Sequence, residues 1–261
     1  PQRPSGRDAK RAARAARAGA SIPYITRSIP YFEVLTDEGL SIIEQNAETI
    51  LAEYGIEFRE DDEALAIWKT AGADVQGSLV KFPRGMCREL VQKNAPPEFV
   101  QYARNPARNV RIGGNSTVFA PAYGSPFILN ADEGRRYARI DDFRNFVKLA
   151  YMAPSLHHSG GTVCEPVDIP VAKRHLDMVY SHIKYSDRAF MGSGTAESRA
   201  EDSIDMARIV FGEDFVDRNC VILGNVNVNS PLVWDSTMTL ALRAYARANQ
   251  ATIITPFILS G

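Results

Sequence analysis

The sequence predicts an α/β protein with a TIM-type (β/α)8 barrel, incomplete in this chain and preceded by an accessory, mainly helical region. Three observations support this fold class. After about residue 116, short apolar or glycine-containing stretches alternate with amphipathic helices, as in the βαβ crossovers of a parallel sheet. Polar residues and glycines follow the end of every predicted strand, where a barrel of this type has its site. No GxGxxG motif follows the first predicted strand, so the dinucleotide-binding pattern of doubly wound sheets is missing.

The composition is that of an ordinary globular protein and argues against several kinds of partner. The chain has 261 residues, of which 45% are hydrophobic and 23% charged, and its formal net charge is −1. That charge gives no overall attraction to nucleic acid or to a membrane, and we find no apolar run of the roughly 20 residues that a membrane span needs. Three scattered cysteines without a CxxC motif and the lack of a signal peptide predict a cytoplasmic protein.

Residues 1–35 form a predicted basic arm and linker. The stretch GRDAKRAARAARAGA repeats alanine and arginine and has the composition of a basic helix. Charged termini are most often solvated or disordered. Contact with RNA or an acidic partner is the alternative interpretation.

Residues 36–115 are the predicted accessory region, and their signals are mostly helical. One helix carries apolar residues at helical spacing between Leu40 and Tyr54, and Gly55 can end it. A second helix contains Trp68 and stops at Gly72. A short hairpin turning at Gln76-Gly77 and a helix over residues 83–94 complete this region.

Residues 116–261 are the predicted first part of the barrel. Residues 116–129 have the pattern of a bent strand or a hairpin, and four amphipathic helices are expected at residues 141–152, 170–184, 197–211 and 236–249. Strands near Thr162, Phe190, Ile222 and Ile254 should be parallel neighbours in that order. These make about five strands where the complete fold has eight, and the sequence ends directly after a strand. We therefore expect an incomplete barrel with an exposed sheet edge and apolar interior.

The stretch CVILGNVNVNSPLVWD, residues 220–235, places amides where a buried strand is usually apolar. Asn225, Asn227 and Asn229 alternate, so they share one face of a strand. Together with Ser230 they predict a wet, ligand-bearing mouth at the strand end, because amides donate and accept hydrogen bonds without adding charge. The alternative is a ladder of asparagines that ties neighbouring strands together.

Several other side chains are candidates for binding a cation. Glu165 follows a predicted strand and could face a cationic substrate or act as a base, although a loop salt bridge is an equal alternative. Tyr123, Phe127 and Trp234 lie near strand ends and could help to cage an onium group, or could simply pack.

Histidine, cysteine and lysine give little support for other chemistry. The spacing of His157, His158 and Cys164 matches no common zinc site, so we expect no metal. His175 and His182 lie on one predicted helix and are expected at the surface. No lysine falls at a strand end, which argues against Schiff-base catalysis.

The segments VFAPAYGSPFIL, VCEPVDIPVAKRHLDMVYSHIKYSDRAFMGSGT, ILGNVNVNSPLVWD and ITPFILSG resemble the trimethylamine methyltransferase family. The similarity covers nearly the whole chain after the basic arm but only the first part of the family's length. The resemblance implies a TIM barrel that moves a methyl group from trimethylamine, glycine betaine or a similar amine to the cobalt of a separate corrinoid protein. It also implies that the mouth holds the corrinoid edge or the polar end of the substrate, with Glu165 and nearby aromatics steadying the cation. For the full-length protein we expect a homo-oligomer.

Two other functions stay open from the sequence. One is a non-catalytic barrel fragment that serves as an interaction or scaffold module. The other is a TIM-barrel lyase or hydrolase, against which the lack of a strand-end lysine or metal triad counts.

Overall fold

The structure is a computed structural model that describes Gly6, residues 22–229 and residues 231–256. Its centre is a parallel sheet of three strands, β10 (Phe190–Met191), β11 (Ile222–Val228) and β13 (Ala251–Pro256), in the order β10-β11-β13. Phe190 pairs with Ile222, and Leu223 to Val228 pair with Ala251 to Pro256. The parallel pairing predicted for these three strands is therefore confirmed, in the predicted order.

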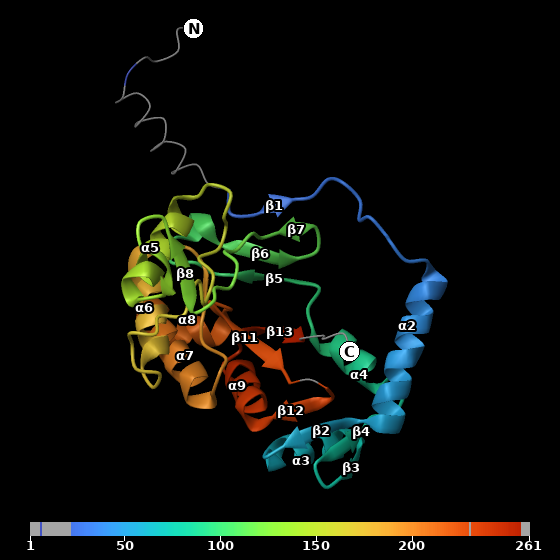
Figure 1. Cartoon of the computed structure of the whole chain (residues 1–261). Coiled ribbons are helices and arrows are strands. Elements are labelled where there is room, and N and C mark those ends of the chain that lie inside the picture. The colour runs from blue at the N-terminus through green and yellow to red at the C-terminus, as the bar shows by residue number, and fades with distance from the viewer. Residues whose placement is uncertain (1–5, 7–21, 230, 257–261) are drawn as a thin grey trace.

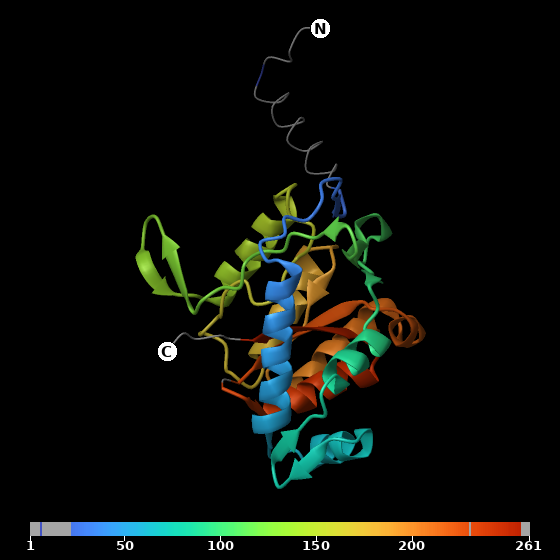
Figure 2. The same cartoon turned by 90° about the vertical axis from the view of Figure 1, so that its right-hand side faces the viewer.

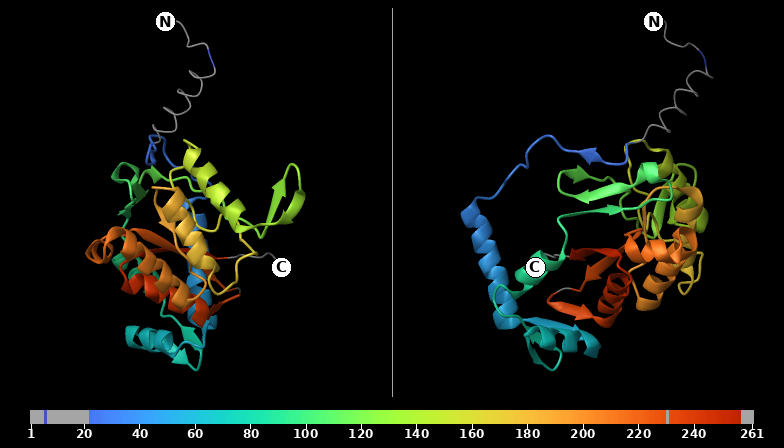
Figure 3. Two further views of the ribbon diagram at one scale, coloured as in Figure 1. Left: turned by 90° about the vertical axis from the view of Figure 1, so that its left-hand side faces the viewer. Right: turned by 180° about the vertical axis from the view of Figure 1, so that it is seen from behind.

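Five helices accompany this sheet; four of them correspond to the predicted amphipathic helices, and the fifth, a short one, was not predicted. Their bounds are α5 (Ile140–Met152), α6 (Arg174–Tyr185), α7 (Glu197–Phe211), α8 (Glu213–Arg218) and α9 (Ser236–Arg247), so the four predicted helices are present with small shifts at their ends. Helices α6 to α9 pack apolar residues on a core that includes Phe190, Ile204, Ile222 and Tyr245, all buried, whereas α5 contributes Phe143 and Val147 to a separate apolar cluster. Figure 3 shows α6, α7 and α9 running side by side across one face of the molecule.

Two predicted strands of the barrel differ in the structure. No strand forms at Thr162; instead the Ser159 N–H donates to the Ala189 carbonyl at 2.8 Å, and Met191 N–H to the Gly160 carbonyl at 2.9 Å, so this segment runs irregularly beside β10. Residues 116–129 begin with β7 (Ser116–Thr117), and prolines at 121 and 126 then withhold backbone donors from any continuous strand.

A hairpin forms, but further along the chain, so the hairpin alternative for residues 116–129 is wrong in its position. Strand β8 (Phe127–Asn130) pairs antiparallel with β9 (Gly134–Tyr137). Figure 2 shows this hairpin projecting from the side of the molecule. The central sheet is open in the part of the chain that the structure describes, so closure into a barrel stays a prediction.

The accessory region contains the predicted hairpin but also more strands than the sequence indicated. Strands β3 and β4 pair antiparallel around Gly77, whose φ of +61° suits glycine. The elements before the central sheet are β1 (Ile25–Thr26), α2 (Asp37–Thr49), the π-helix η1 (Ile50–Tyr54), β2 (Ile56–Arg59), α3 (Asp62–Ala71), β3 (Asp74–Gln76), β4 (Leu79–Lys81), α4 (Met86–Asn94), β5 (Glu98–Gln101), the 3-10 turn η2 (Pro106–Arg108) and β6 (Val110–Gly113).

The accessory region is joined to the C-terminal region by a sheet and an ion pair. Strand β12 (Val233–Asp235) adds in parallel to β2, giving the order β12-β2-β4-β3. Nearby, the Arg243 guanidinium of α9 donates to the Asp61 carboxylate at 2.6 Å, and Thr239 donates to the same carboxylate. Asp61 also caps α3 through the Ala64 N–H. The two regions are thus held by buried, mutually paired groups.

Helix α2, like α4, has no buried residue in the described structure. Figures 1 and 3 show it standing apart from α5 to α9. Leu40, Ile42 and Ile43 are each more than half exposed. An apolar helix face of this kind is a typical contact surface for another part of a protein or for a partner.

A polar cluster seals the amino end of the central sheet. The buried Gln101 of β5 donates through Nε2 to the carbonyls of Phe190 at 2.9 Å and Val221 at 3.2 Å. Its Oε1 lies 3.1 Å from Nε2 of the buried His158. Buried polar groups therefore close the amino end of β10 and β11.

The described parts of the chain include no helix whose length and apolar character would let it cross a bilayer.

Candidate functional site

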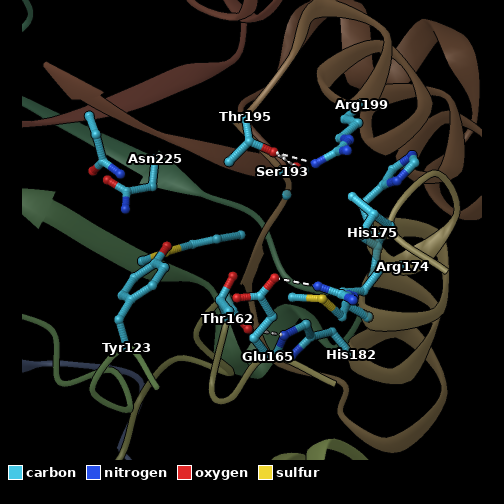
Figure 4. Close-up of a pocket in the computed structure, with 18 residues that line it drawn as sticks. Tyr123, Thr162, Glu165, Arg174, His175, His182, Ser193, Thr195, Arg199 and Asn225 are labelled. Carbon is cyan, nitrogen blue, oxygen red and sulfur yellow. Dashed lines mark hydrogen bonds and ion pairs between the residues drawn. The ribbon is translucent and has the colours of Figure 1, made fainter. Parts of the chain in front are cut away.

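A cavity of about 260 Å³ opens at the carboxyl ends of β10 and β11. Its walls come from the loop before β8, the loop around residues 161–165, α6 with the segment before it, the end of β10 with the loop that follows, the first turn of α7, and β11. Figure 4 shows its polar side chains converging from these different elements. Those that line it are Tyr123, Thr162, Glu165, Arg174, His175, His182, Ser193, Thr195, Arg199, Asn225 and Asn227.

Two of the predicted asparagines line this cavity. Asn225 and Asn227 lie on the same face of β11, as alternate residues do, while the intervening Val226 is buried on the opposite face. The Thr255 hydroxyl of β13 donates to Asn225 Oδ1 at 2.5 Å. Asn225 therefore also ties two strands together, which was the alternative interpretation of the asparagine row.

The third asparagine lies elsewhere, so the prediction that Asn229 joins the other two is wrong. Strand β11 ends at Val228, and the chain then turns back through Leu232, whose φ is +53°. Asn229 is exposed, bridges to Val233 and donates to Asp235 at 2.9 Å. Ser230, the other predicted residue of this turn, lies outside the described residues.

Glu165 reaches the cavity from an irregular loop and is paired with a cation. The Arg174 guanidinium at the start of α6 donates to the Glu165 carboxylate and also to the Ile169 carbonyl, at 3.1 and 3.2 Å. The Arg174 side chain is 13% exposed and that of Glu165 46%. The loop salt bridge considered for Glu165 is therefore present, and the pair contributes no net charge to the cavity.

Tyr123 is the one of the three predicted aromatic residues that lines the cavity. Its hydroxyl lies 3.1 Å from the Met191 sulfur and rests against Gly161, where an added Cβ would come within 2.7 Å of the hydroxyl oxygen. Desolvation raises the pKa of Tyr123, and the neighbouring Asn225 amide acts in the opposite direction. The phenol is thus a neutral hydrogen-bond donor at physiological pH.

The other two aromatic residues pack elsewhere, so an aromatic cage made of all three is wrong for this cavity. Phe127 of β8 packs on Tyr137 with ring centres 4.6 Å apart. Trp234 of β12 stacks on Phe58 at 6.5 Å. Both belong to elements that turn away from the end of β10.

The histidines of α6 are buried, contrary to the surface position expected from the sequence. Helix α6 packs between α5 and α7, so it is covered on two sides. His182 donates from Nε2 to the Gly161 carbonyl at 2.8 Å and accepts from the Ser159 hydroxyl at Nδ1, 2.7 Å away. Burial lowers the pKa of His182 to about 4, so the ring is neutral at physiological pH. His175 Nε2 lies 2.8 Å from an Asp202 oxygen.

His157, His158 and Cys164 do not gather around a common point. The backbone N–H of Phe119 donates to His157, and that of Gly160 donates to His158. Cys164 packs in a separate apolar cluster, and burial raises its pKa to about 12. In the described part of the chain no group of three or more histidine, cysteine, aspartate or glutamate side chains is arranged to hold a metal ion.

Arg199 and Thr195 are cavity residues that sequence reasoning missed, whereas Ser193 directly follows a predicted strand. Arg199 Nη1 donates to the Thr195 hydroxyl at 3.0 Å, and the Ser193 and Thr195 hydroxyls are 3.3 Å apart. Within the described ranges Arg199 forms no ion pair with a carboxylate. The available signal was an arginine shortly after the strand-end sequence MGSGT.

The chain is similar in sequence to known methyltransferases. The family model described as "Trimethylamine methyltransferase (MTTB)" matches residues 3–261. The chain is 44% identical over 234 residues to a glycine betaine methyltransferase of Desulfitobacterium hafniense (strain Y51), covering 89% of this chain and 48% of that protein. It is 26% identical over 220 residues to a proline betaine:corrinoid methyltransferase of Eubacterium limosum, covering 80% of this chain and 44% of that protein. The chain thus spans about half the length of the curated relatives it matches.

Proposed function

The chain belongs to the trimethylamine methyltransferase family, and on this basis we propose that the protein moves a methyl group from a methylated amine to the cobalt of a corrinoid carried by a separate protein. Both relatives are named as betaine methyltransferases, and the name of one includes a corrinoid. These names support a methylated amine as donor and a corrinoid protein as partner.

The reaction makes few demands for acid or base groups. A quaternary amine is a poor methyl donor to ordinary nucleophiles, whereas the corrinoid supplies cobalt as Co(I), a very strong nucleophile. The carbon–nitrogen bond breaks with its electron pair left on the amine, which departs neutral, and the carbon–cobalt bond forms with the electron pair of Co(I). The protein's contribution is to hold donor and acceptor in line.

The cavity residues fit this task. Asn225 and Asn227 present neutral amides that can bond to the amide groups at a corrin edge or to the polar end of a donor. Tyr123 adds a neutral hydroxyl and an aromatic face. His182 is neutral and has both ring nitrogens bonded within the protein, so it is not arranged to exchange protons with a ligand.

The observation that carries the proposal is the meeting of Tyr123, Asn225 and Asn227 on one cavity at the carboxyl end of a parallel sheet. Sites in (β/α) barrels lie at this end of the strands. The sealed amino end, with Gln101 bonded to Phe190 and Val221, leaves the carboxyl end as the accessible one.

Barrel closure belongs to the same proposal. Strand β13 pairs with β11 on one side only in the described structure, and its Ile253 and Ile254 are 40% and 50% exposed. A further strand added to β13 would cover such an edge. We expect a chain ending at Gly261 to aggregate or self-associate, and to be inactive in methyl transfer. A clean monomer by size-exclusion chromatography that binds no apolar dye would contradict barrel closure.

The test of the proposed function is methyl transfer to reduced cobalamin. The full-length protein is mixed with Co(I) cobalamin and with trimethylamine, glycine betaine, carnitine or choline, and the loss of Co(I) absorbance is followed. We expect loss with at least one donor, and none without protein. Failure of every donor in a broad panel would contradict the methyltransferase assignment for this protein.

A further inference from the structure

We propose that Arg199, with the hydroxyls of Ser193 and Thr195, binds a carboxylate of the methyl donor. The donor is then a carboxylate-bearing quaternary amine, and amines or amino alcohols without a carboxylate are poor ligands. This inference deepens the proposed function and rests on it, because it concerns the same cavity.

The charges that line the cavity are unbalanced. Its charged side chains are Arg174, Arg199 and Glu165, so two arginines face one glutamate. Arg174 and Glu165 are paired with each other, which leaves the Arg199 guanidinium as an excess positive charge. The histidines do not alter this balance, since His182 is neutral and His175 has its own carboxylate partner in Asp202.

Arg199 lies at a position in its helix where a cation without a carboxylate partner among the described residues is unfavourable. Arg199 is the third residue of α7, and a cation near a helix N-terminus opposes the helix dipole. Glu197, in the same turn, lies on another side of the helix, toward Arg243 of α9. Together with Asp61 and Glu63 it raises the pKa of Arg243. A bound anion beside Arg199 would offset the unfavourable interaction between the guanidinium and the helix dipole.

The loop that carries the two hydroxyls is held rigidly. The Tyr245 hydroxyl donates to the Ser193 carbonyl at 2.8 Å, and the Ser193 N–H donates to the Ser203 hydroxyl at 3.1 Å. An added Cβ on Gly194 would come within 2.2 Å of the Asn225 carbonyl oxygen, so only glycine allows the loop to lie this close to β11. The hydroxyls beside the guanidinium are therefore preorganised, which is what a carboxylate site needs.

The two ends of the cavity suit the two ends of a zwitterion. Figure 4 shows Arg199, Ser193 and Thr195 on one side and Tyr123 with Asn225 on the other. A carboxylate at Arg199 directs the quaternary nitrogen of a small betaine toward the Tyr123 ring, whose face attracts cations. The positive end of the donor is thereby kept away from the unpaired guanidinium.

The test is direct ligand binding without any corrinoid. Calorimetry on the full-length protein compares glycine betaine with choline, which has the same cationic group and no carboxylate. We expect glycine betaine to bind at least about tenfold more tightly. Arg199→Gln should weaken glycine betaine binding by roughly tenfold to a hundredfold and leave choline binding unchanged, since a hydrogen bond to a charged group is lost.

Two further variants keep the result interpretable. Arg208→Gln changes a partly exposed arginine of the same helix, outside the cavity lining, that pairs with Asp205 and Asp217, and it should leave both affinities unchanged. Arg199→Lys keeps the charge and should recover part of the glycine betaine affinity even if Arg199→Gln folds poorly. Equal binding of choline and glycine betaine by the wild type, or equal loss of both in Arg199→Gln, would overturn the inference.

Failure of the proposed function has a different signature. If glycine betaine binds through Arg199 but no donor methylates Co(I) cobalamin, the carboxylate site stands and methyl transfer is wrong. If trimethylamine or choline methylates cobalamin while glycine betaine neither binds nor reacts, methyl transfer stands and the carboxylate site is wrong.

Discussion

The two ends of the central sheet use similar polar side chains for opposite purposes. At the amino end, the Gln101 amide is buried and bonded to two backbone carbonyls and to His158. At the carboxyl end, the amides of Asn225 and Asn227 border a cavity that holds the Arg199 guanidinium, which pairs with no carboxylate of the residues that the structure describes. The difference teaches that an amide on a strand is informative about function only once its hydrogen-bond partners are known: complete internal satisfaction marks structure, and an incomplete set marks a place for a ligand.

The largest effect on stability should come from the amino end. Gln101→Leu removes the donor to the Phe190 and Val221 carbonyls and leaves His158 without its partner. We expect the free energy of unfolding to fall by about 2–4 kcal/mol, the usual result of breaking a buried hydrogen-bond network. Urea denaturation measures this loss.

The matched control for that change is Gln76→Leu. Gln76 is an exposed glutamine of β3 that bonds only to Asp74, and its replacement should change the free energy of unfolding by no more than about 0.5 kcal/mol. A Gln101→Leu variant as stable as Gln76→Leu would contradict the structural assignment of the amino end.

The next largest effect should come from Gly194→Ala at the carboxyl end. The added Cβ meets the Asn225 carbonyl, so the Ser193–Thr195 loop must move. Overpacking of this kind costs roughly 1–3 kcal/mol, and we expect it to be accompanied by loss of glycine betaine binding. Calorimetry and thermal denaturation measure the two losses together.

A glycine outside the cavity provides the comparison. Gly39 in α2 would place its Cβ no closer than 3.5 Å to another atom. Gly39→Ala should leave binding unchanged and stabilise the helix slightly, by about 0.5–1 kcal/mol. If Gly194→Ala binds glycine betaine normally, the rigid loop is not part of the site.

Lowering the pH should reduce the stability that depends on the amino end of the sheet, while ligand binding at the carboxyl end stays unchanged above about pH 5. Burial, with smaller contributions from His182 and Arg188, lowers the pKa of His158 to about 3. Because the unfolded chain takes up a proton near pH 6.5 and the folded chain does not, stability should fall as the pH drops from about 6.5 toward 3. The slope is at most about 1.4 kcal/mol per pH unit for this one group.

The pH measurement has a built-in comparison. Denaturation of a His158→Gln variant should depend less steeply on pH than that of the wild type, because one titrating group is gone. Glycine betaine binding above about pH 5 should stay flat, because guanidinium groups do not lose their proton in proteins. An identical pH slope for wild type and variant would show that His158 is not buried as a neutral ring.

The smallest effect should come from Glu165→Gln. The Glu165 carboxylate is half-exposed and already paired with Arg174, so it has less capacity to hold a cationic donor than an unpaired carboxylate. Its removal leaves Arg174 unneutralised and should weaken choline binding by a few-fold to about tenfold, with less effect on glycine betaine. A large, equal loss of both ligands would indicate that Glu165 contacts the donor directly.

The local features of the fold could be predicted from the sequence, and the tertiary features of the site could not. The strand at Ile222 and its flanking helices follow from apolar runs and helical spacing, which are local signals. The burial of His182 depends on α5 and α7 covering both sides of α6, which no spacing within one helix reveals. The turn after Val228, which moves Asn229 away from the cavity, has a turn signal in Asn229 and Pro231 that the sequence-based prediction of one shared asparagine face did not weigh.

The charged residues of the site show the same difference between local and tertiary features. Glu165 was recognised as a candidate from its place after a strand, but its partner Arg174 lies nine residues further on, in the next helix. Arg199 was missed because an arginine in a first helical turn is usually solvated. Only the cavity around it, and the absence of a carboxylate beside it in the described structure, single it out.

The most direct test of the account is a crystal structure of the full-length protein with glycine betaine bound. The account predicts the ligand at the carboxyl end of β10 and β11, with a carboxylate oxygen at roughly 2.7–3.2 Å from the Arg199 guanidinium and the trimethylammonium group toward Tyr123. A carboxylate bound away from Arg199, or a ligand in a cavity that Asn225 and Asn227 do not line, would contradict it.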